Sequence, residues 1–258
     1  MKKIFICLTS AFMMLTVQGF SSNLKPELNI PSKAFFKEMR NTLDPKGLFE
    51  KCSSLKTVYA ETTEVIFTDK LYFYYKNPNC YMVSNKGNKK KPSYSSSFIK
   101  DKFYVYFEGK GGEVEDSKVR PNIKLLKDYF KQYILRFDEL SGNLKLSDNI
   151  VTVDGVKCRE LIQKNIDYMS GGVIKYFFNT ENYQLVKQLC LSSPDTKYTS
   201  TDTYSKFVYK TVNQIKFPVS FEYTLEYKNQ PKSNNVTHMK LLKFELNSNI
   251  PDKVFTQQ

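Results

Sequence analysis

Residues 217–227 read FPVSFEYTLEY and alternate between large apolar and polar side chains. One set comprises Phe217, Val219, Phe221, Tyr223, Leu225 and Tyr227, and the other comprises Ser220, Glu222, Thr224 and Glu226. Because successive side chains of a strand point to opposite faces, this pattern predicts a strand with one buried and one solvated face. Residues 242–246 repeat the pattern, with Leu242, Phe244 and Leu246 on one side. The sequence therefore predicts an antiparallel sheet that is covered on one side only.

Such a sheet buries its apolar face by curling, by packing on a second sheet or by taking up a helix. Residues 121–137 have the spacing of that helix. Its apolar stripe contains Ile123, Leu126, Phe130, Tyr133 and Phe137, with Leu125, Tyr129 and Ile134 beside it. The opposite side carries Lys124, Lys127, Asp128 and Lys131. We expect this helix to cover the sheet.

The remaining elements form two strand meanders on either side of that helix. We expect a helix over residues 29–42 and a short one from the Asp44-Pro45 start signal to about Cys52. Turns are expected at residues 68–70 and 77–79 and at the glycines 109, 111 and 112, and a polar loop over residues 85–97. Strands of the first meander are predicted over residues 57–67, 71–75, 80–83 and 103–107. Strands of the second are predicted over residues 150–153, 156–166, 173–178, 184–191, 203–212, 217–227 and 239–246, with a hairpin at Asp154-Gly155.

The N-terminus resembles a cleavable secretory signal. Lys2 and Lys3 precede an apolar run from Ile4 to Val17, and small residues follow, with Gly19 at the predicted cleavage point. The run is shorter than the roughly twenty residues that span a bilayer. We therefore expect residues 1–19 to be a signal peptide, residues 20–258 to form a single domain, and the mature protein to be periplasmic without a membrane span.

The chain carries a formal net charge of +13, almost all of it from lysine rather than arginine. Bidentate phosphate recognition favours arginine, so scattered lysine argues against a nucleic-acid partner and for a solvated surface. A basic surface that binds anionic lipid headgroups or nucleic acid, with a binding that salt weakens, stays open as an alternative.

Four cysteines remain after the signal: Cys52, Cys80, Cys158 and Cys190. Two disulfides, with three pairings, and buried free thiols are both compatible with their spacing. They are too far apart for a CxxC motif.

The sequence lacks the signature of a catalytic site. His238 is the single histidine, which leaves few options for a nucleophile–histidine pair or a histidine metal site. No phosphate-loop, dinucleotide or hydrolase motif is present. The acidic cluster of Glu113, Glu115 and Asp116 is typical of a solvated loop. We therefore expect that the protein is not an enzyme and that it has no catalytic residues, no metal site and no cofactor.

Several short sequence segments, and the order in which they follow one another, resemble the Lol-type periplasmic lipoprotein carriers and outer-membrane lipoprotein-sorting proteins (LolA and LolB). Residues 70–78 (KLYFYYKNP) resemble the opening strand of that family's sheet, and residues 176–187 (YFFNTENYQLVK) its strand–turn–strand. Phe217-Pro218 with the strand after it, and residues 249–255 (NIPDKVF), resemble its last two elements.

The resemblance implies a mainly β (α+β) fold, an incompletely closed antiparallel β-barrel covered by helices around an apolar cavity. It also implies a periplasmic carrier or binder of lipid or lipoprotein acyl chains, with a helix lid that swings away for release. The ligand-binding residues we expect on the strands are Phe73, Phe103, Val105, Phe221, Tyr223 and Leu225. Those expected on the lid are Leu126, Phe130, Tyr133 and Ile134.

Two other readings fit the same sequence. The first is a non-catalytic envelope protein with the same fold, a filled core and a protein partner. The second is that each expected site residue is ordinary core, packed by its neighbours. The carrier hypothesis predicts that lipid co-purifies with the protein, whereas the other two interpretations predict that it does not.

Overall fold

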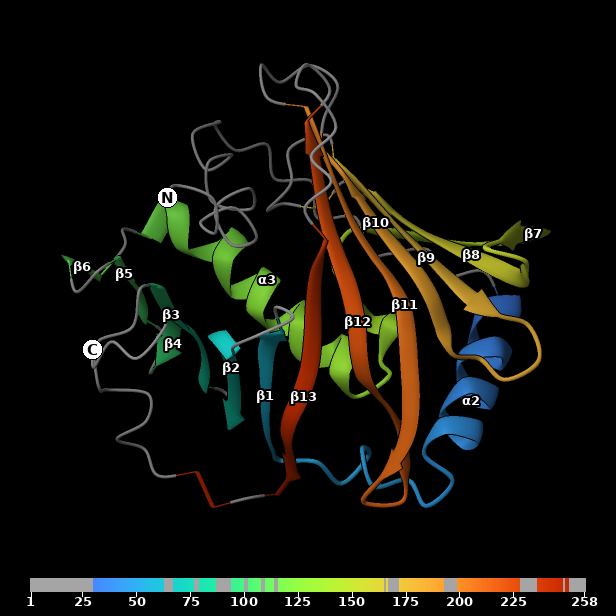
Figure 1. The fold of residues 1–258 in the computed structure, drawn as a ribbon, viewed down its shortest axis with the longest axis horizontal. Coiled ribbons are helices and arrows are strands. Elements are labelled where there is room, and N and C mark those ends of the chain that lie inside the picture. The colour runs from blue at the N-terminus through green and yellow to red at the C-terminus, as the bar shows by residue number, and fades with distance from the viewer. Residues whose placement is uncertain are drawn as a thin grey trace.

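A single antiparallel sheet of 13 strands dominates the computed structural model (Figure 1). The structure describes residues 30–62, 67–76, 79–86, 94–99, 102–107, 110–113, 116–164, 166, 172–192, 199–227, 236–247 and 249–250. It describes the backbone alone for residues 30–32, 61–62, 67–69, 79–86, 94–96, 98–99, 103, 105–107, 116–123 and 126. The predicted signal peptide lies outside the described residues.

The strands follow one another around the sheet in the order β6-β5-β4-β3-β2-β1-β13-β12-β11-β10-β9-β8-β7. The first meander consists of β1 (Ser54–Thr62), β2 (Phe67–Lys76), β3 (Asn79–Lys86), β4 (Tyr94–Ile99), β5 (Lys102–Phe107) and β6 (Lys110–Glu113). The second consists of β7 (Asn143–Val153), β8 (Val156–Lys164), β9 (Val173–Asn179), β10 (Leu185–Leu191), β11 (Ser200–Val212), β12 (Ile215–Tyr227) and β13 (Thr237–Leu246).

The first and last strands join the two meanders. β1 pairs with β13 from Leu55↔Leu246 to Thr62↔His238, so residues 176 to 191 positions apart lie side by side. β6 and β7 remain the two edges of the sheet, and helix α3 (Asp116–Tyr133) connects them. The sheet is therefore curved but not closed into a barrel, which confirms the predicted fold class.

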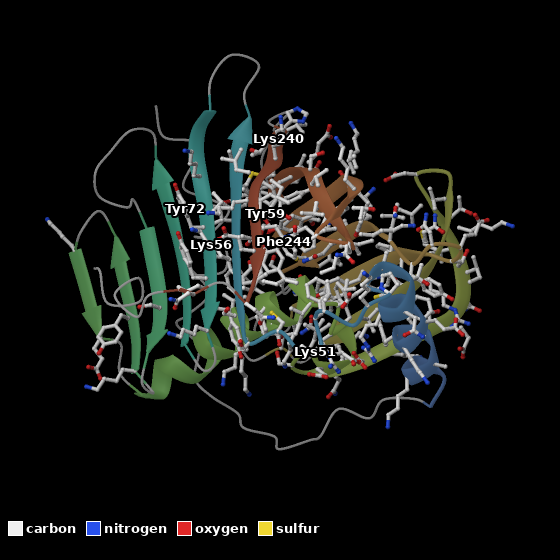
Figure 2. The ribbon with its side chains drawn as sticks, turned by 90° about the horizontal axis from the view of Figure 1, so that it is seen from below. Lys51, Lys56, Tyr59, Tyr72, Lys240 and Phe244 are labelled. Carbon is white, nitrogen blue, oxygen red and sulfur yellow. The ribbon has the colours of Figure 1, made fainter. Side chains whose placement is uncertain are left out.

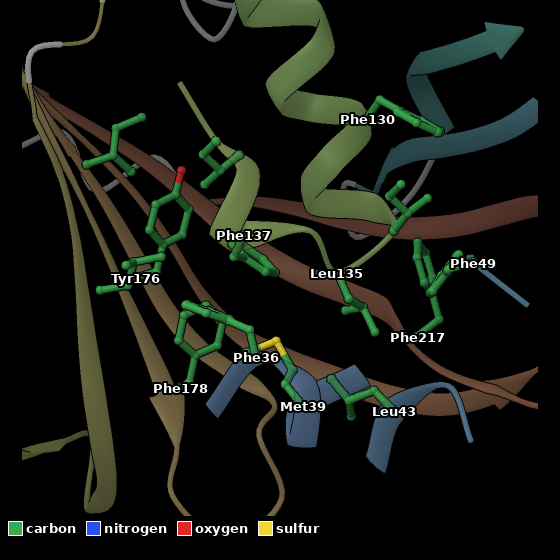
Figure 3. Packing of buried hydrophobic residues seen from close by; sticks show 14 of the residues in the cluster. Phe36, Met39, Leu43, Phe49, Phe130, Leu135, Phe137, Tyr176, Phe178 and Phe217 are labelled. Atoms are coloured by element: carbon green, nitrogen blue, oxygen red, sulfur yellow. The ribbon is translucent and has the colours of Figure 1, made fainter. Parts of the chain in front are cut away.

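Both described α-helices, α3 and α2 (Ile30–Leu43), lie on the inner side of this curved sheet (Figure 1). The buried face of α2 packs Phe35 and Phe36 against Phe178 of β9 at ring distances of 6.0 and 6.3 Å. Arg40 of α2 also donates a 2.7 Å hydrogen bond to Asp138 of the 3-10 helix η1 (Phe137–Glu139). These contacts place α2 under the second meander, and Figure 3 shows the shared core of α2, η1 and the sheet.

Several local predictions need correction. The turn expected at residues 68–70 lies inside β2, and the loop expected over 85–97 contains the end of β3 and part of β4. The glycine segment forms β6 instead of a turn, and α3 begins at Asp116 and ends at Tyr133. The short helix expected after Asp44 is a set of turns, although the Asp44 carboxylate does accept the N–H groups of Leu48 (3.0 Å) and Phe49 (2.7 Å).

The alternation in residues 242–246 is also broken. Leu241, not Leu242, pairs with Tyr59 on the inner face, because β13 has a bulge where Val58 pairs with Lys243. The extra residue of the bulge is Leu242, whose side chain is 44% exposed. By contrast, the hairpin at Asp154-Gly155 is confirmed, with both φ angles positive (50° and 79°), as a type I′ turn requires.

Candidate ligand-binding surface

The predicted site residues divide into buried, half-buried and undescribed side chains. Phe73, Phe130, Ile134 and Tyr223 are buried, with 2–8% of their surface exposed. Tyr133, Phe221 and Leu225 are half-buried. The side chains of Phe103, Val105 and Leu126 lie outside the described part of the structure.

The C-terminal half of α3 packs its aromatic residues onto the first meander. Phe130 stacks on Tyr75 of β2 with ring centroids 3.5 Å apart. Tyr133 lies 5.3 Å from Phe73 and stacks on Tyr59 of β1 at 6.5 Å. The structure therefore brings three of the predicted residues, Phe73, Phe130 and Tyr133, into one aromatic cluster at the junction of β1 and β2.

The cluster continues along the inner face of β11 and β12. Tyr59 contacts Phe221 at 5.3 Å, and Phe221 in turn lies 6.0 Å from Tyr204 and 5.5 Å from Phe207. Tyr204, Phe207 and Phe221 are half-buried, unlike the ring of Phe73. An aromatic surface thus extends from beneath α3 to a region where its rings reach solvent. We call this surface the inner aromatic face; its described rings are those of Tyr59, Phe73, Tyr75, Phe130, Tyr133, Tyr204, Phe207, Phe217, Phe221 and Tyr223.

Backbone register places the other predicted strand residues in line with this face. Phe73 pairs with Met82, Met82 with Ser96, and Ser96 with Val105. A second row joins Tyr75 to Phe103 through β3 and β4. Residues paired across a sheet share a face, so the positions of Phe103 and Val105 belong to the inner face of the first meander.

The opposite flank of α3 is fixed by polar contacts. The buried carboxylate of Asp128 accepts hydrogen bonds from the Ser141 N–H (3.0 Å), the Ser141 hydroxyl (2.5 Å) and the Gln163 amide (3.2 Å). The Gln163 carbonyl accepts the hydroxyl of Tyr176 at 2.8 Å, and the Gln132 amide donates to that hydroxyl at 3.3 Å. This buried polar network joins α3 to β8 and β9 of the second meander. The aromatic contacts of α3 are mainly with the first meander, although Tyr133 also stacks on Phe217 of β12 at 6.1 Å.

Sequence reasoning missed this network and part of the inner aromatic face. Asp128 belonged to the expected solvated side of α3, yet it is 1% exposed. Tyr59 and Tyr75 were not selected as site residues, although each lies two positions from another residue of the inner face along its strand. That two-residue spacing is the signal from which both could have been found.

Burial changes the acidity of the tyrosines that line α3. Desolvation raises the pKa of Tyr133 to about 12 and raises the pKa of Tyr59 well above its usual value. Thr57 lies close enough to Tyr133 to lower that pKa slightly, but its fully buried hydroxyl makes no hydrogen bond of normal geometry within the described structure. Tyr59 and Tyr133 are therefore uncharged across the physiological pH range.

The polar residues considered as catalytic or metal-binding groups, His238 and Glu113, lie away from the inner aromatic face. His238 is exposed beside Glu222, with 3.5 Å between Nδ1 and the carboxylate. Glu113 pairs with Lys102 at 2.9 Å at the exposed end of the sheet. Among the described residues, no histidine, cysteine, aspartate and glutamate side chains gather in a group able to hold a metal ion.

The described cysteines are thiols. Cys52 and Cys158 donate to the backbone carbonyls of Ser54 (3.1 Å) and Val156 (3.4 Å), and the Gln188 amide contacts the Cys190 sulfur at 3.4 Å. Burial raises the pKa of the Cys52 and Cys158 thiols, which lowers their reactivity. The side chain of Cys80 lies outside the described residues.

No helix in the described part of the chain is both long enough and apolar enough to span a bilayer. No family model matches the sequence, and no curated protein matches it significantly. Solved structures do match its fold. A DUF1329 family protein from Desulfovibrio piger is 12% identical with a TM-score of 0.53, covering 88% of this chain and 98% of that one.

A domain from Vibrio parahaemolyticus, assigned as an outer membrane lipoprotein-sorting protein, is 9% identical with a TM-score of 0.50, covering 87% of this chain and 95% of its own. A LolA superfamily protein from Nitrosomonas europaea is 13% identical with a TM-score of 0.49, covering 86% and 96% of the two chains. The likenesses to the D. piger and V. parahaemolyticus proteins confirm the predicted LolA-like fold, an incomplete barrel covered by helices.

Proposed function

We propose that this chain is an exported, non-enzymatic carrier or binder of lipid or lipoprotein acyl chains, which it holds against the inner aromatic face beside α3. The observation that carries the proposal is the continuity of that face. It runs from the contact of Tyr133 with the buried ring of Phe73 to the half-buried rings of Phe221 and Tyr204.

An acyl chain gains roughly 25 cal/mol for each Å² of apolar surface removed from water. The half-buried rings of Phe221, Tyr204 and Phe207 offer part of that surface. The ligand enters there and extends toward Leu225, Tyr223 and the α3 residues Phe130, Tyr133 and Ile134. The V. parahaemolyticus domain, which shares the fold, is assigned to lipoprotein sorting, and this supports the same class of ligand.

The two flanks of α3 suggest how the surface opens. Aromatic contacts on the first meander, such as Tyr133 with Phe73, are replaced by acyl-chain contacts at little net cost. The buried polar network of Asp128, Ser141 and Gln163 has no such replacement, because a lipid tail offers no hydrogen bond. We therefore propose that α3 tilts about its Asp128 flank instead of swinging away as a whole.

The alternative, an envelope interaction protein with a filled core, is favoured by one observation. Phe73, Phe130 and Ile134 are 2–8% exposed, so the predicted site beneath α3 is packed by its own side chains. In that case the protein binds no lipid and the exposed part of the face contacts a protein partner of the envelope.

Native mass spectrometry of the protein, expressed with its first 19 residues in an exporting bacterium, tests the proposal. We expect loss of the signal peptide after Gly19 and a stoichiometric acylated ligand, identified after organic extraction. Phe221→Glu removes the ligand, whereas Thr224→Glu, on the opposite face of β12, retains it. A ligand-free wild-type protein that also takes up no added fatty acid contradicts the proposal and supports the filled-core alternative.

A further inference from the structure

The outer face of the sheet gathers lysines where the two meanders meet. The outer lysine patch consists of Lys56, Lys70, Lys206, Lys240 and Lys243. Register places Lys240 and Lys70 on either side of Ala60, and Lys243 beside Val58. Figure 2 shows Lys56 and Tyr72 on one side of β1, with the core residues Tyr59 and Phe244 on the other.

The described acidic groups leave part of this charge uncompensated. Glu245 lies 2.8 Å from Lys243 and 3.9 Å from Lys56. Glu222 lies 2.9 Å from Lys206. Lys70 and Lys240 are exposed and form no ion pair with any described residue. They lie two strands apart, at a backbone separation of about 10 Å.

Exposed apolar side chains accompany these lysines. Leu242, at the bulge of β13, is 44% exposed, and Val208 of β11 is 48% exposed. Val208 pairs with Ser220, which pairs with Lys240, so Val208 belongs to the same cross-strand row as Lys240 and Lys70. These are two of the four large aliphatic side chains that the described residues expose.

Tyrosines complete the surface on the β2 side. The rings of Tyr72 and Tyr74 are parallel within 3° at 6.2 Å, and the Lys56 ammonium lies 5.5 Å from the Tyr74 ring centre. Both rings are half-buried. Tyrosine has an apolar ring and a polar hydroxyl, which suits it to the boundary between lipid headgroups and acyl chains.

We propose that this outer face docks on the surface of an anionic phospholipid bilayer. An acidic protein would match the lysines alone. A bilayer also accounts for Leu242 and Val208, which enter the upper acyl region while the neighbouring lysines meet phosphate groups. The bulge of β13 adds Leu242 beside Lys243, and the Leu242 side chain is exposed there.

This docking does not depend on acyl-chain binding, because the two use opposite faces of β1, β12 and β13. Docking by the outer face leaves the inner aromatic face and α3 unobstructed. Failure of one activity is therefore measured separately from failure of the other.

Co-sedimentation of the full chain with vesicles tests the proposal. We expect binding to vesicles of phosphatidylglycerol and phosphatidylcholine, and none to phosphatidylcholine alone. Each lysine near an anionic surface contributes roughly a fivefold factor, so Lys70→Glu with Lys240→Glu lowers the partition coefficient by about twentyfold or more. The matched control is Lys145→Glu with Lys164→Glu, two exposed lysines on β7 and β8, which changes it less than about threefold.

Leu242→Ser separates a bilayer from a soluble polyanion. This substitution keeps the charge, so it lowers vesicle binding severalfold but leaves binding to heparin unchanged. Three results overturn the proposal: no binding to the anionic vesicles, equal losses in the two lysine double variants, or vesicle binding that is insensitive to Leu242→Ser. Folding of each variant is checked by circular dichroism, and its uptake of a fatty-acyl probe shows that the inner face is intact.

Discussion

The ring of Phe130 lies parallel to the ring of Tyr75, with 3.5 Å between their centres and 11° between their planes. Phe130 belongs to α3 and Tyr75 to β2, so this stack packs the helix against the first meander. The buried polar network around Asp128 anchors the same helix to the second meander by hydrogen bonds. α3 thereby holds together two meanders that, among the described strands, pair with each other through β1 and β13.

Truncation of Phe130 tests the aromatic half of this arrangement. We expect Phe130→Ala to lower the free energy of unfolding by roughly 3–5 kcal/mol, since it removes a buried ring and leaves a cavity. Urea denaturation followed by circular dichroism measures the change. Phe130→Leu retains most of the volume and should cost less than half as much. A loss below about 1 kcal/mol for the alanine variant would mean that the stack does not hold α3 in place.

Removal of the Asp128 carboxylate tests the polar half. Asp128→Ala leaves the Ser141 N–H and hydroxyl without their acceptor and leaves the Gln163 amide with the Ser141 carbonyl as its remaining acceptor, which we expect to cost about 3 kcal/mol. Hydrogen exchange should show faster exchange in α3 and in β8 together. Asp148→Ala, at an exposed position of β7, is the control and should change stability by less than about 0.5 kcal/mol. Equal effects of the two substitutions would rule out the network as an anchor.

The buried hydroxyl of Thr57 gives a prediction of opposite sign. Its oxygen is fully buried without a hydrogen bond in the described structure, and valine has nearly the same shape. Thr57→Val should therefore raise the free energy of unfolding by about 1–2 kcal/mol. Thr152→Val, at an exposed position, should have little effect on stability. A clear destabilisation by Thr57→Val would show that the hydroxyl has a partner in solution.

Alkaline pH should destabilise the protein through its buried tyrosines. The pKa of Tyr133 is raised from 10.0 to about 12 by burial, so the unfolded chain loses this proton first. The protonated tyrosine contributes fully to stability below pH 10. That contribution is lost as the pH rises from 10 to 12, and the total loss of unfolding free energy for this residue is roughly 3 kcal/mol. Tyrosinate absorbance and circular dichroism, recorded together, should show that the tyrosines with a raised pKa ionise at the same pH at which the protein unfolds. Complete tyrosine ionisation near pH 10 in a folded protein would contradict the prediction.

Local patterns in the sequence predicted the long strands well. Phe217–Tyr227 forms β12 with only two further residues at its start, because alternation over many positions leaves a single register that buries the rings. β4 was missed because its serine-rich sequence, YSSSFI, has the composition of a loop, and the strand is specified by its pairing with β3 and β5. β6 was missed for the same reason, since KGGE has no strand preference of its own.

The aromatic cluster beneath α3 was predicted in part. Phe73, Phe130 and Tyr133 come together because their patterns identify the inner faces of β2 and α3. The role of Tyr59 depends on the pairing of β1 with β13, a contact between the two ends of the fold that no local pattern encodes. The burial of Asp128 likewise depends on Ser141 and Gln163, which reach it through the folding of β7 and β8 onto α3.

Titration of the folded protein with a fluorescent acyl-chain probe tests the central claim most directly. We predict saturable binding near one probe per chain that changes little between low and high salt, because an apolar contact is not screened. Phe221→Glu should abolish the binding and Thr224→Glu should leave it within about twofold of the wild-type affinity. A wild-type protein that binds no probe, or binding that Phe221→Glu and Thr224→Glu affect equally, would contradict an acyl-chain site on the inner aromatic face.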